Sequence, residues 1–206
     1  YIKWDMNRSI SECYSIAYPA DRQGEIFHRY ILGVYELHER LMQAFPQLLI
    51  ESCASGGGRF DAGMLYYAPQ GWVSDDSDAV ERLKIQYGTS FCYPLSCMDA
   101  HVSACPNEQV GRVTPLETRG NVACTGAFGY ELDLNRLSPE EIETVKRQVA
   151  FYKEQRKLIA QGEFYRLLSP FEGNFAAWQI VSQDKRTSLV TVTRMLSEAN
   201  GPYRRL

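Results

Sequence analysis

Short extended runs alternate with longer helical runs along most of the chain, and this alternation constrains the fold more than any other feature. Apolar side chains recur with helical spacing between residues 25 and 45, and Pro46 ends that run. Extended apolar segments stand on either side of it, at residues 1–5 and 48–53. Alternation of this kind is typical of an α/β architecture.

The same pattern continues downstream. We predict further strands at 72–74, 91–95 and 121–125, and a helix at 79–87, which gives five strands in the first part of the chain. The best-marked helix begins at Ser138, with Pro139 at the first helical position and Glu141 completing a capping box. Gly162 is its expected end.

The period of the pattern changes after residue 174. Two alternating runs, 177–181 and 188–193, flank Asp184-Lys185-Arg186 and predict a β-hairpin. We therefore expect a boundary near 168–173 that divides the chain into 1–170 and 171–206.

The opening octapeptide YIKWDMNR, residues 1–8, places charges at the end of a strand. Alternate side chains share a face, so Lys3 and Asp5 point one way and Ile2 and Trp4 the other. In a (β/α) barrel, the catalytic residues stand at the C-terminal ends of the strands, and Asp5 is a carboxylate in such a position. Lys3 would favour the ionised form of Asp5. The alternative is a surface ion pair with no further role.

Composition excludes several classes of protein. The net charge of −3 gives no reason to expect nucleic acid or an anionic membrane surface as partner. No apolar run approaches the roughly 20 residues of a membrane span, and no signal peptide is visible. The six cysteines include no C-x-x-C pair, and three histidines give a zinc site no support. Reduced thiols in a cytoplasmic protein are expected, with no cofactor and no metal.

Three segments together resemble one known family. They are residues 1–8, residues 51–61 (ESCASGGGRFD) and residues 71–78 (GWVSDDSD). In order and spacing they are similar to the signatures of the α-galactosidases of glycoside hydrolase family 36, and the likeness continues through 81–90, 100–103 and 129–133. The resemblance implies the C-terminal part, about strands 4 to 8, of a TIM-like (β/α)8 barrel, followed by the start of an antiparallel β-domain. It also implies a homo-oligomer, a tetramer in this family.

The resemblance assigns the two carboxylates that glycoside hydrolysis needs. Asp5 matches the nucleophile, and the candidates for the general acid/base are Asp75, Asp76 and Asp78. Asp78 stands three residues before Glu81 at a helix start, so capping is its expected role. Asp75 follows the predicted strand directly and is the first aspartate of the motif, whereas Asp76 remains an alternative.

The same motifs suggest a sugar-binding set made of Lys3, Asn7, Cys53, Gly56 and Gly57. A turn-forming asparagine and a small buried cysteine are the simpler explanations for two of them. The glycines allow backbone N–H groups close to a ligand, but no P-loop lysine accompanies them, which argues against a phosphate site. His101, beside Asp99, has no partner motif, and we expect a satisfied strand-end histidine.

The expected function is therefore that of a retaining exo-α-galactosidase acting on terminal α-galactosides of the raffinose and melibiose type. Within the same scaffold, a galactosyltransferase of the raffinose- or stachyose-synthase kind and an α-N-acetylgalactosaminidase remain open. An inactive sugar-binding or structural piece is the alternative from another class. With five strands where a closed barrel has eight, the 206-residue chain alone is expected to be inactive.

Overall fold

The computed structural model describes residues 1–8 and 10–200, and the chain forms two compact units, Tyr1–Asp75 and Asp76–Leu206. Both contain parallel strands connected through helices, which confirms the predicted α/β class. None of the helices in the described ranges is long and apolar enough to span a membrane.

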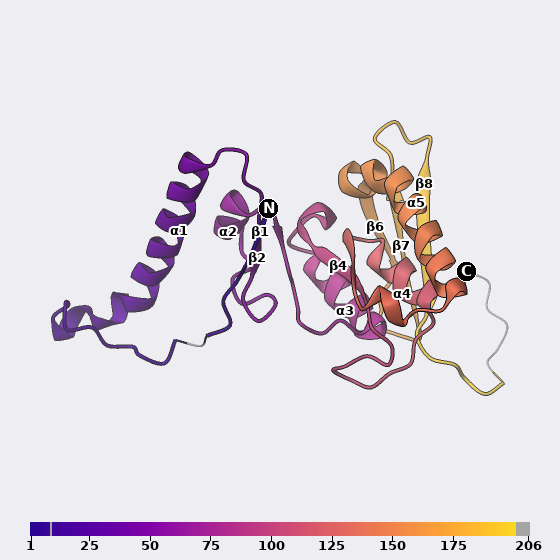
Figure 1. Cartoon of the computed structure of the whole chain (residues 1–206), viewed down its shortest axis with the longest axis horizontal. Coiled ribbons are helices and arrows are strands. Elements are labelled where there is room, and N and C mark those ends of the chain that lie inside the picture. The colour runs from indigo at the N-terminus through magenta and orange to yellow at the C-terminus, as the bar shows by residue number, and fades with distance from the viewer. Residues whose placement is uncertain (9, 201–206) are drawn as a thin grey trace. The chain divides into compact units, whose positions relative to one another are not determined.

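The first unit is a three-stranded parallel sheet with helices beside it (Figure 1). Its strand order is β1-β2-β3, and β1 pairs with β2 in a register that aligns Lys3 with Glu51 and Asp5 with Cys53. The elements in chain order are β1 (Ile2–Asp5), the 3-10 helix η1 (Ala20–Glu25), α1 (Ile26–Ala44), β2 (Ile50–Cys53), α2 (Ala62–Tyr67) and β3 (Gln70–Gly71).

One face of this sheet packs against the helices. Ile50 of β2, together with Met64 and Ala68 from the α2 region, forms a buried cluster, and Trp4 of β1 packs against it. The Trp4 ring lies 5.0 Å from the ring of the buried His38 on α1. Trp4 therefore has a structural role, and the alternate residues Lys3 and Asp5 belong to the opposite face, as the strand alternation predicts.

The second unit combines a parallel pair of strands with an antiparallel sheet (Figure 1). Strands β4 and β5 are parallel, and β6, β7 and β8 form the antiparallel sheet in that order. Its elements are α3 (Ala79–Thr89), η2 (Leu95–Cys97), β4 (Asp99–Ser103), α4 (Leu116–Ala123), β5 (Ala127–Glu131), η3 (Leu134–Arg136), α5 (Pro139–Gln161), β6 (Glu163–Leu168), β7 (Phe175–Val181) and β8 (Ser188–Arg194).

Two predictions with strong local chemistry are confirmed. The Ser138 hydroxyl accepts a hydrogen bond from the Glu141 N–H at 3.2 Å, and the Glu141 carboxylate accepts one from the Ser138 N–H at 2.8 Å, so the capping box is complete. The helix ends with Gly162 as its C-cap. The predicted hairpin is formed by β7 and β8.

Three predicted strands are misplaced. Residues 91–95 form turns rather than a strand, since Pro94 has no N–H to give to a sheet, and the strand is β4, at 99–103. Residues 121–123 complete α4 and 124–125 form a turn; Val122 and Ala123 are each only 2% exposed, so helix packing decides their conformation. The third strand is β3, at 70–71, although the Trp72 N–H still donates to Ser52 across the sheet at 2.9 Å.

The sequence analysis also missed a strand. β6 follows α5 directly and pairs antiparallel with β7, so the antiparallel sheet begins at Glu163, ahead of the region suggested for the boundary. In the described residues six strands, β1 to β6, therefore precede the suggested boundary, one more than the five expected. The division into 1–170 and 171–206 stays a prediction.

Candidate active site

Strand register gathers the predicted polar side chains of β1 and β2 on one face of the first sheet. Side chains of paired residues in neighbouring strands point to the same side. Lys3, Asp5, Glu51 and Cys53 therefore share the face opposite the Trp4 core. Asp5 ends β1 and Cys53 ends β2, so a carboxylate and a thiol stand side by side at the C-terminal edge.

Asp5 is exposed and held by neutral donors. The Asn7 side-chain amide donates to its carboxylate at 3.1 Å. The Cys53 thiol is its second neighbour: burial, and then hydrogen bonding to Asp5, raise the pKa of this thiol to about 11. The thiol stays protonated near neutral pH and can donate to the carboxylate.

Lys3 forms its ion pair with Glu51 rather than with Asp5, so the alternative of a Lys3–Asp5 surface ion pair is wrong. Lys3 Nζ lies 2.8 Å from the Glu51 carboxylate, and it also lies 5.1 Å from the centre of the Trp72 ring. Glu51 is directly across the sheet from Lys3. Asp5 is two residues further along the same strand, which corresponds to about 6.6 Å between the two Cα atoms. A buried carboxylate also needs a counter-charge more than an exposed one does.

Glu51 is the residue of this face that sequence reasoning missed. Its side chain is only 4% exposed. The signal was present: one carboxylate interrupts the apolar run that leads into the glycine motif, and a strand with a buried face does not keep such a residue without a partner.

The glycine loop after β2 connects the strand end that carries Asp5 to the segment that carries Asp75. Asn7 Oδ1 accepts a hydrogen bond from the Ser55 N–H at 2.7 Å, so Asn7 joins Asp5 to this loop. Gly56 has a φ of +74°, and a Cβ there would lie 2.6 Å from the backbone of Ser74 and of Asp75. Only glycine permits both this conformation and this approach.

The neighbouring glycine repeats that contact. A Cβ on Gly57 would lie 2.6 Å from the Val73 carbonyl oxygen. Two successive glycines thus pack their backbone onto residues 73–75, and Asp75 is exposed at the end of that segment. Asp5 and Asp75 consequently border the same loop.

Two further residues of the glycine motif have structural roles that the sequence did not predict. The Arg59 guanidinium donates to the carbonyls of Met6 at 3.2 Å and of Cys53 at 2.7 Å, which ties the ends of β1 and β2 together. Asp61 caps α2 by accepting from the Met64 N–H at 2.9 Å.

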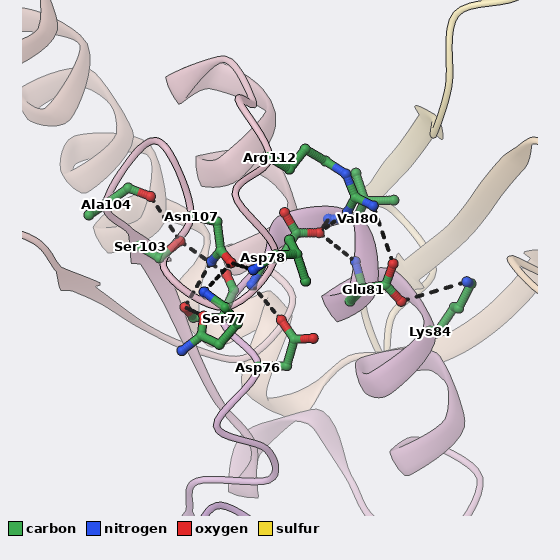
Figure 2. A network of polar contacts seen from close by, with 12 residues as sticks. Asp76, Ser77, Asp78, Val80, Glu81, Lys84, Ser103, Ala104, Asn107 and Arg112 are labelled. Atoms are coloured by element: carbon green, nitrogen blue, oxygen red, sulfur yellow. Dashed lines mark hydrogen bonds and ion pairs between the residues drawn. The ribbon is translucent and has the colours of Figure 1, made fainter.

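Asp78 caps α3, as predicted (Figure 2). Its Oδ2 accepts from the N–H groups of Val80 and Glu81 at 3.0 Å each, and the Arg112 guanidinium pairs with the same oxygen. Asp76 accepts from the Asp78 N–H at 3.0 Å, which is a local turn contact. Asp78 is therefore a structural residue, and Asp76 takes part in shaping the turn.

Ser77 fastens this turn to the loop after β4 (Figure 2). Its hydroxyl accepts from Asn107 Nδ2 at 3.2 Å and donates to Gln109 Oε1 at 3.0 Å. Its carbonyl accepts from the Ser103 hydroxyl at 3.1 Å. The segment that follows Asp75 is held by side chains rather than left free.

His101 lies on β4 and faces the neighbouring strand β5. Its Nδ1 lies 3.6 Å from the Glu131 carboxylate on β5, and a Cβ on the facing Gly129 would come within 2.9 Å of its ring. Within residues 1–8 and 10–200, no three His, Cys, Asp or Glu side chains gather as a metal site would require.

A cavity of about 420 Å³ opens beside the glycine loop. Asn7 is the one member of the predicted sugar-binding set among its lining residues, and neither Asp5 nor Asp75 lines it. A larger cavity, of about 690 Å³, lies over the antiparallel sheet, is lined mainly by apolar side chains such as Leu167 and Val192, and contains none of the predicted site residues.

Comparison with known proteins agrees with these motifs. Residues 1–162 match the sequence profile of the melibiase family. The chain is 59% identical over 202 residues to alpha-galactosidase AgaA of Geobacillus stearothermophilus, covering 98% of this chain and 28% of that protein. Crystal structures of AgaA variants in complex with raffinose and with stachyose each superpose with a TM-score of 0.94 at 59% identity, covering 97% and 99% of this chain and 28% and 29% of theirs. The chain spans less than a third of the length of these relatives, and it belongs to the melibiase family.

Proposed function

We propose that this chain is the part of a retaining α-galactosidase that carries both catalytic carboxylates, on about strands 4 to 8 of a (β/α)8 barrel. Asp5 is the nucleophile and Asp75 the general acid/base. The observation that carries the proposal is the glycine loop, which is bonded to the Asp5 side through Asn7 and packed on the backbone of Asp75. The same loop therefore positions both carboxylates.

The relatives support this assignment. The AgaA variants crystallised with raffinose and with stachyose each carry a substituted aspartate, and these two aspartates lie 70 positions apart. Asp5 and Asp75 are separated by the same 70 positions. Asp76 and Asp78 do not match that spacing, and their side chains accept backbone N–H groups of the turn and of α3.

The reaction proceeds in two displacements. Asp5 attacks the anomeric carbon of a terminal non-reducing α-D-galactose while Asp75 protonates the departing glycosidic oxygen, which leaves a β-galactosyl ester on Asp5. Asp75, now a base, deprotonates a water molecule that attacks the same carbon and releases Asp5. Two inversions give net retention, and the carboxyl groups should lie roughly 5–5.5 Å apart in the complete enzyme.

The sugar-binding set acts around this centre. Lys3 has N–H donors beyond the one directed at Glu51 and presents them to sugar hydroxyls. Cys53, Gly56 and Gly57 border the proposed galactose site next to Asp5, the glycines by exposing backbone. Asn7 holds Asp5 and the loop through both ends of its amide, so positioning the nucleophile is its first task.

Raffinose and melibiose are the expected substrates, and we propose a homo-oligomeric cytoplasmic enzyme without cofactor. The decisive experiment is an assay of the complete enzyme on 4-nitrophenyl α-galactoside, with raffinose as competing donor and acceptor and with the products identified. Free galactose as the main product supports the proposal. Lengthened oligosaccharides as the main product would make the enzyme a galactosyltransferase, and no turnover would refute the catalytic assignment.

A further inference from the structure

Glu51 is a buried charge on the face of the sheet that carries the nucleophile. The residue is only 3% exposed, and its strand β2 is buried along its whole length. Removing an ionised carboxylate from water is unfavourable unless a counter-charge and hydrogen bonds replace the water. Lys3 supplies that counter-charge, with Nζ 2.8 Å from the carboxylate.

The Lys3–Glu51 ion pair lies on the same face as Asp5 and therefore affects which groups contact Asp5. Lys3 has two carboxylates on its own face, Glu51 across the sheet and Asp5 two residues along its strand. It forms an ion pair with Glu51 and lies over the Trp72 ring. Within the part of the chain that the structure describes, Asp5 instead contacts the neutral Asn7 amide and the Cys53 thiol. A carboxylate tightly paired with an ammonium group is a stabilised anion and a weaker nucleophile.

We propose that Glu51 is a positioning residue for galactoside hydrolysis, acting through Lys3. Resting on the proposed function, the inference assigns it two effects. Glu51 keeps the Lys3 ammonium group off the Asp5 carboxylate, and it aims the remaining Lys3 N–H donors at one or two hydroxyls of the galactose ring. The charge of Lys3 stays in the site without neutralising the nucleophile.

A purely structural ion pair is the competing explanation, because removing one partner of a buried pair leaves the other charge unpaired and damages the fold. The two explanations differ in what they predict for substrates that lack single hydroxyls. A positioning role affects only the hydroxyl that Lys3 binds. Structural damage slows every substrate by a similar factor.

The test uses the complete enzyme and four galactosides with a 4-nitrophenyl leaving group, deoxygenated in turn at C2, C3, C4 and C6. Variants are Glu51→Gln, Lys3→Met and the double variant. Glu36→Gln is the matched control, because Glu36 makes the same kind of ion pair with Arg40 on α1 while its side chain is 63% exposed.

For Glu51→Gln we expect kcat/KM on the parent galactoside to fall about 10- to 100-fold. This is the effect of losing one charge-assisted hydrogen bond from Lys3 to the sugar. Removing the hydroxyl that Lys3 binds should lower kcat/KM in the wild type but not in Lys3→Met. Removing the same hydroxyl should also cause no loss in Glu51→Gln. The double variant should be no slower than Lys3→Met, because the two residues act as a unit. The Glu36→Gln control should match the wild type within about twofold.

An equal loss on all four deoxy substrates would overturn the proposal, as would wild-type kinetics for Glu51→Gln. If Glu51→Gln does not fold, the double variant, which buries no charge, is compared with Lys3→Met; a further loss of more than about 10-fold shows a role independent of Lys3 and also overturns it. These failures differ from failure of the proposed function, which would show as an inactive wild type or an active Asp5→Gly.

Discussion

Asp5 and Asp78 are the same residue type in opposite environments. Asp5 ends a strand, is exposed, and has the neutral Asn7 amide and Cys53 thiol as neighbours. Asp78 begins a helix, is 1% exposed, and binds two backbone N–H groups and the Arg112 guanidinium with one oxygen. In the proposed function the Asp5 carboxylate is the nucleophile, whereas the Asp78 carboxylate is occupied by helix N–H groups and a guanidinium.

The comparison teaches that partners, more than burial alone, separate a reacting carboxylate from a structural one. A carboxylate held by a cation and helix N–H groups is stabilised as an anion and fixed in place. A carboxylate beside neutral donors retains free lone pairs that can attack carbon. Substitutions at Asp5 should therefore affect turnover, and substitutions at Asp78 should affect stability.

The largest effect is expected for Asp5→Gly in the complete enzyme. Turnover of 4-nitrophenyl α-galactoside should fall by roughly 10⁴-fold or more, because no other group on this strand can form the ester. Added azide should partly restore the reaction from the vacated side and give β-galactosyl azide, identified by NMR. Near-normal activity would remove Asp5 from the nucleophile role.

Asp75→Gly should be slower by about 10²- to 10³-fold, in a way that depends on the leaving group. Aryl galactosides with good leaving groups need little protonation, so their first step should survive while the ester accumulates, and azide should then give α-galactosyl azide. Asp76→Gly is the control. If Asp76→Gly shows this leaving-group dependence and Asp75→Gly does not, the acid/base is Asp76.

Gly56→Ala should disturb the loop that Asp5 and Asp75, the two proposed catalytic aspartates, both border. The φ of +74° and the approach of 2.6 Å to backbone atoms leave no room for a methyl group. We expect the free energy of unfolding to fall by about 2–4 kcal/mol, together with a loss of activity. At Gly33 on α1, an added Cβ would meet nothing within 4 Å. Gly33→Ala should therefore raise the free energy of unfolding by about 0.5–1 kcal/mol, as measured by urea unfolding. Equal effects at the two glycines would contradict the packing described.

Asp78→Ala should destabilise the complete enzyme by about 2–4 kcal/mol, because α3 loses its cap and Arg112 loses its partner. The folded fraction should keep kcat/KM within about tenfold of the wild type. Asp133→Ala, at the exposed cap of η3, should change the unfolding free energy by less than about 1 kcal/mol. A catalytic loss at Asp78 as large as that at Asp5 would break the comparison.

The smallest effect concerns the Cys53 thiol. Because burial raises its pKa to about 11, it should remain protonated and alkylate slowly with iodoacetamide. The exposed Cys13, Cys92 and Cys105 should react first, as followed by peptide mass spectrometry. Rapid labelling of Cys53 would mean that it does not serve as the neutral donor to Asp5.

Local chemistry was enough to predict part of this structure. The capping box at Ser138, the Asp78 cap and the alternation of Trp4 with Asp5 follow from side chains that act within a few residues. Strands 91–95 and 121–125 failed because turns at Pro94 and the packing of α4 override strand propensity.

The partner of Lys3 could not be predicted from β1 alone. Within one strand Asp5 was the available carboxylate, and Glu51 enters only through the register with β2. The bond from Asn7 to the glycine loop likewise joins residues 48 positions apart. Contacts between strands position these side chains, and the motifs predict only which residues belong to the proposed site.

Trapping the covalent intermediate tests the central claim most directly. The complete enzyme is incubated with a fluorinated galactosyl fluoride that forms the ester faster than it hydrolyses, then digested, and the labelled peptide is sequenced by mass spectrometry. The account predicts one fluorogalactosyl group, attached to Asp5. A label on Asp75 or Asp76, or an active enzyme that never acquires a label, would contradict it.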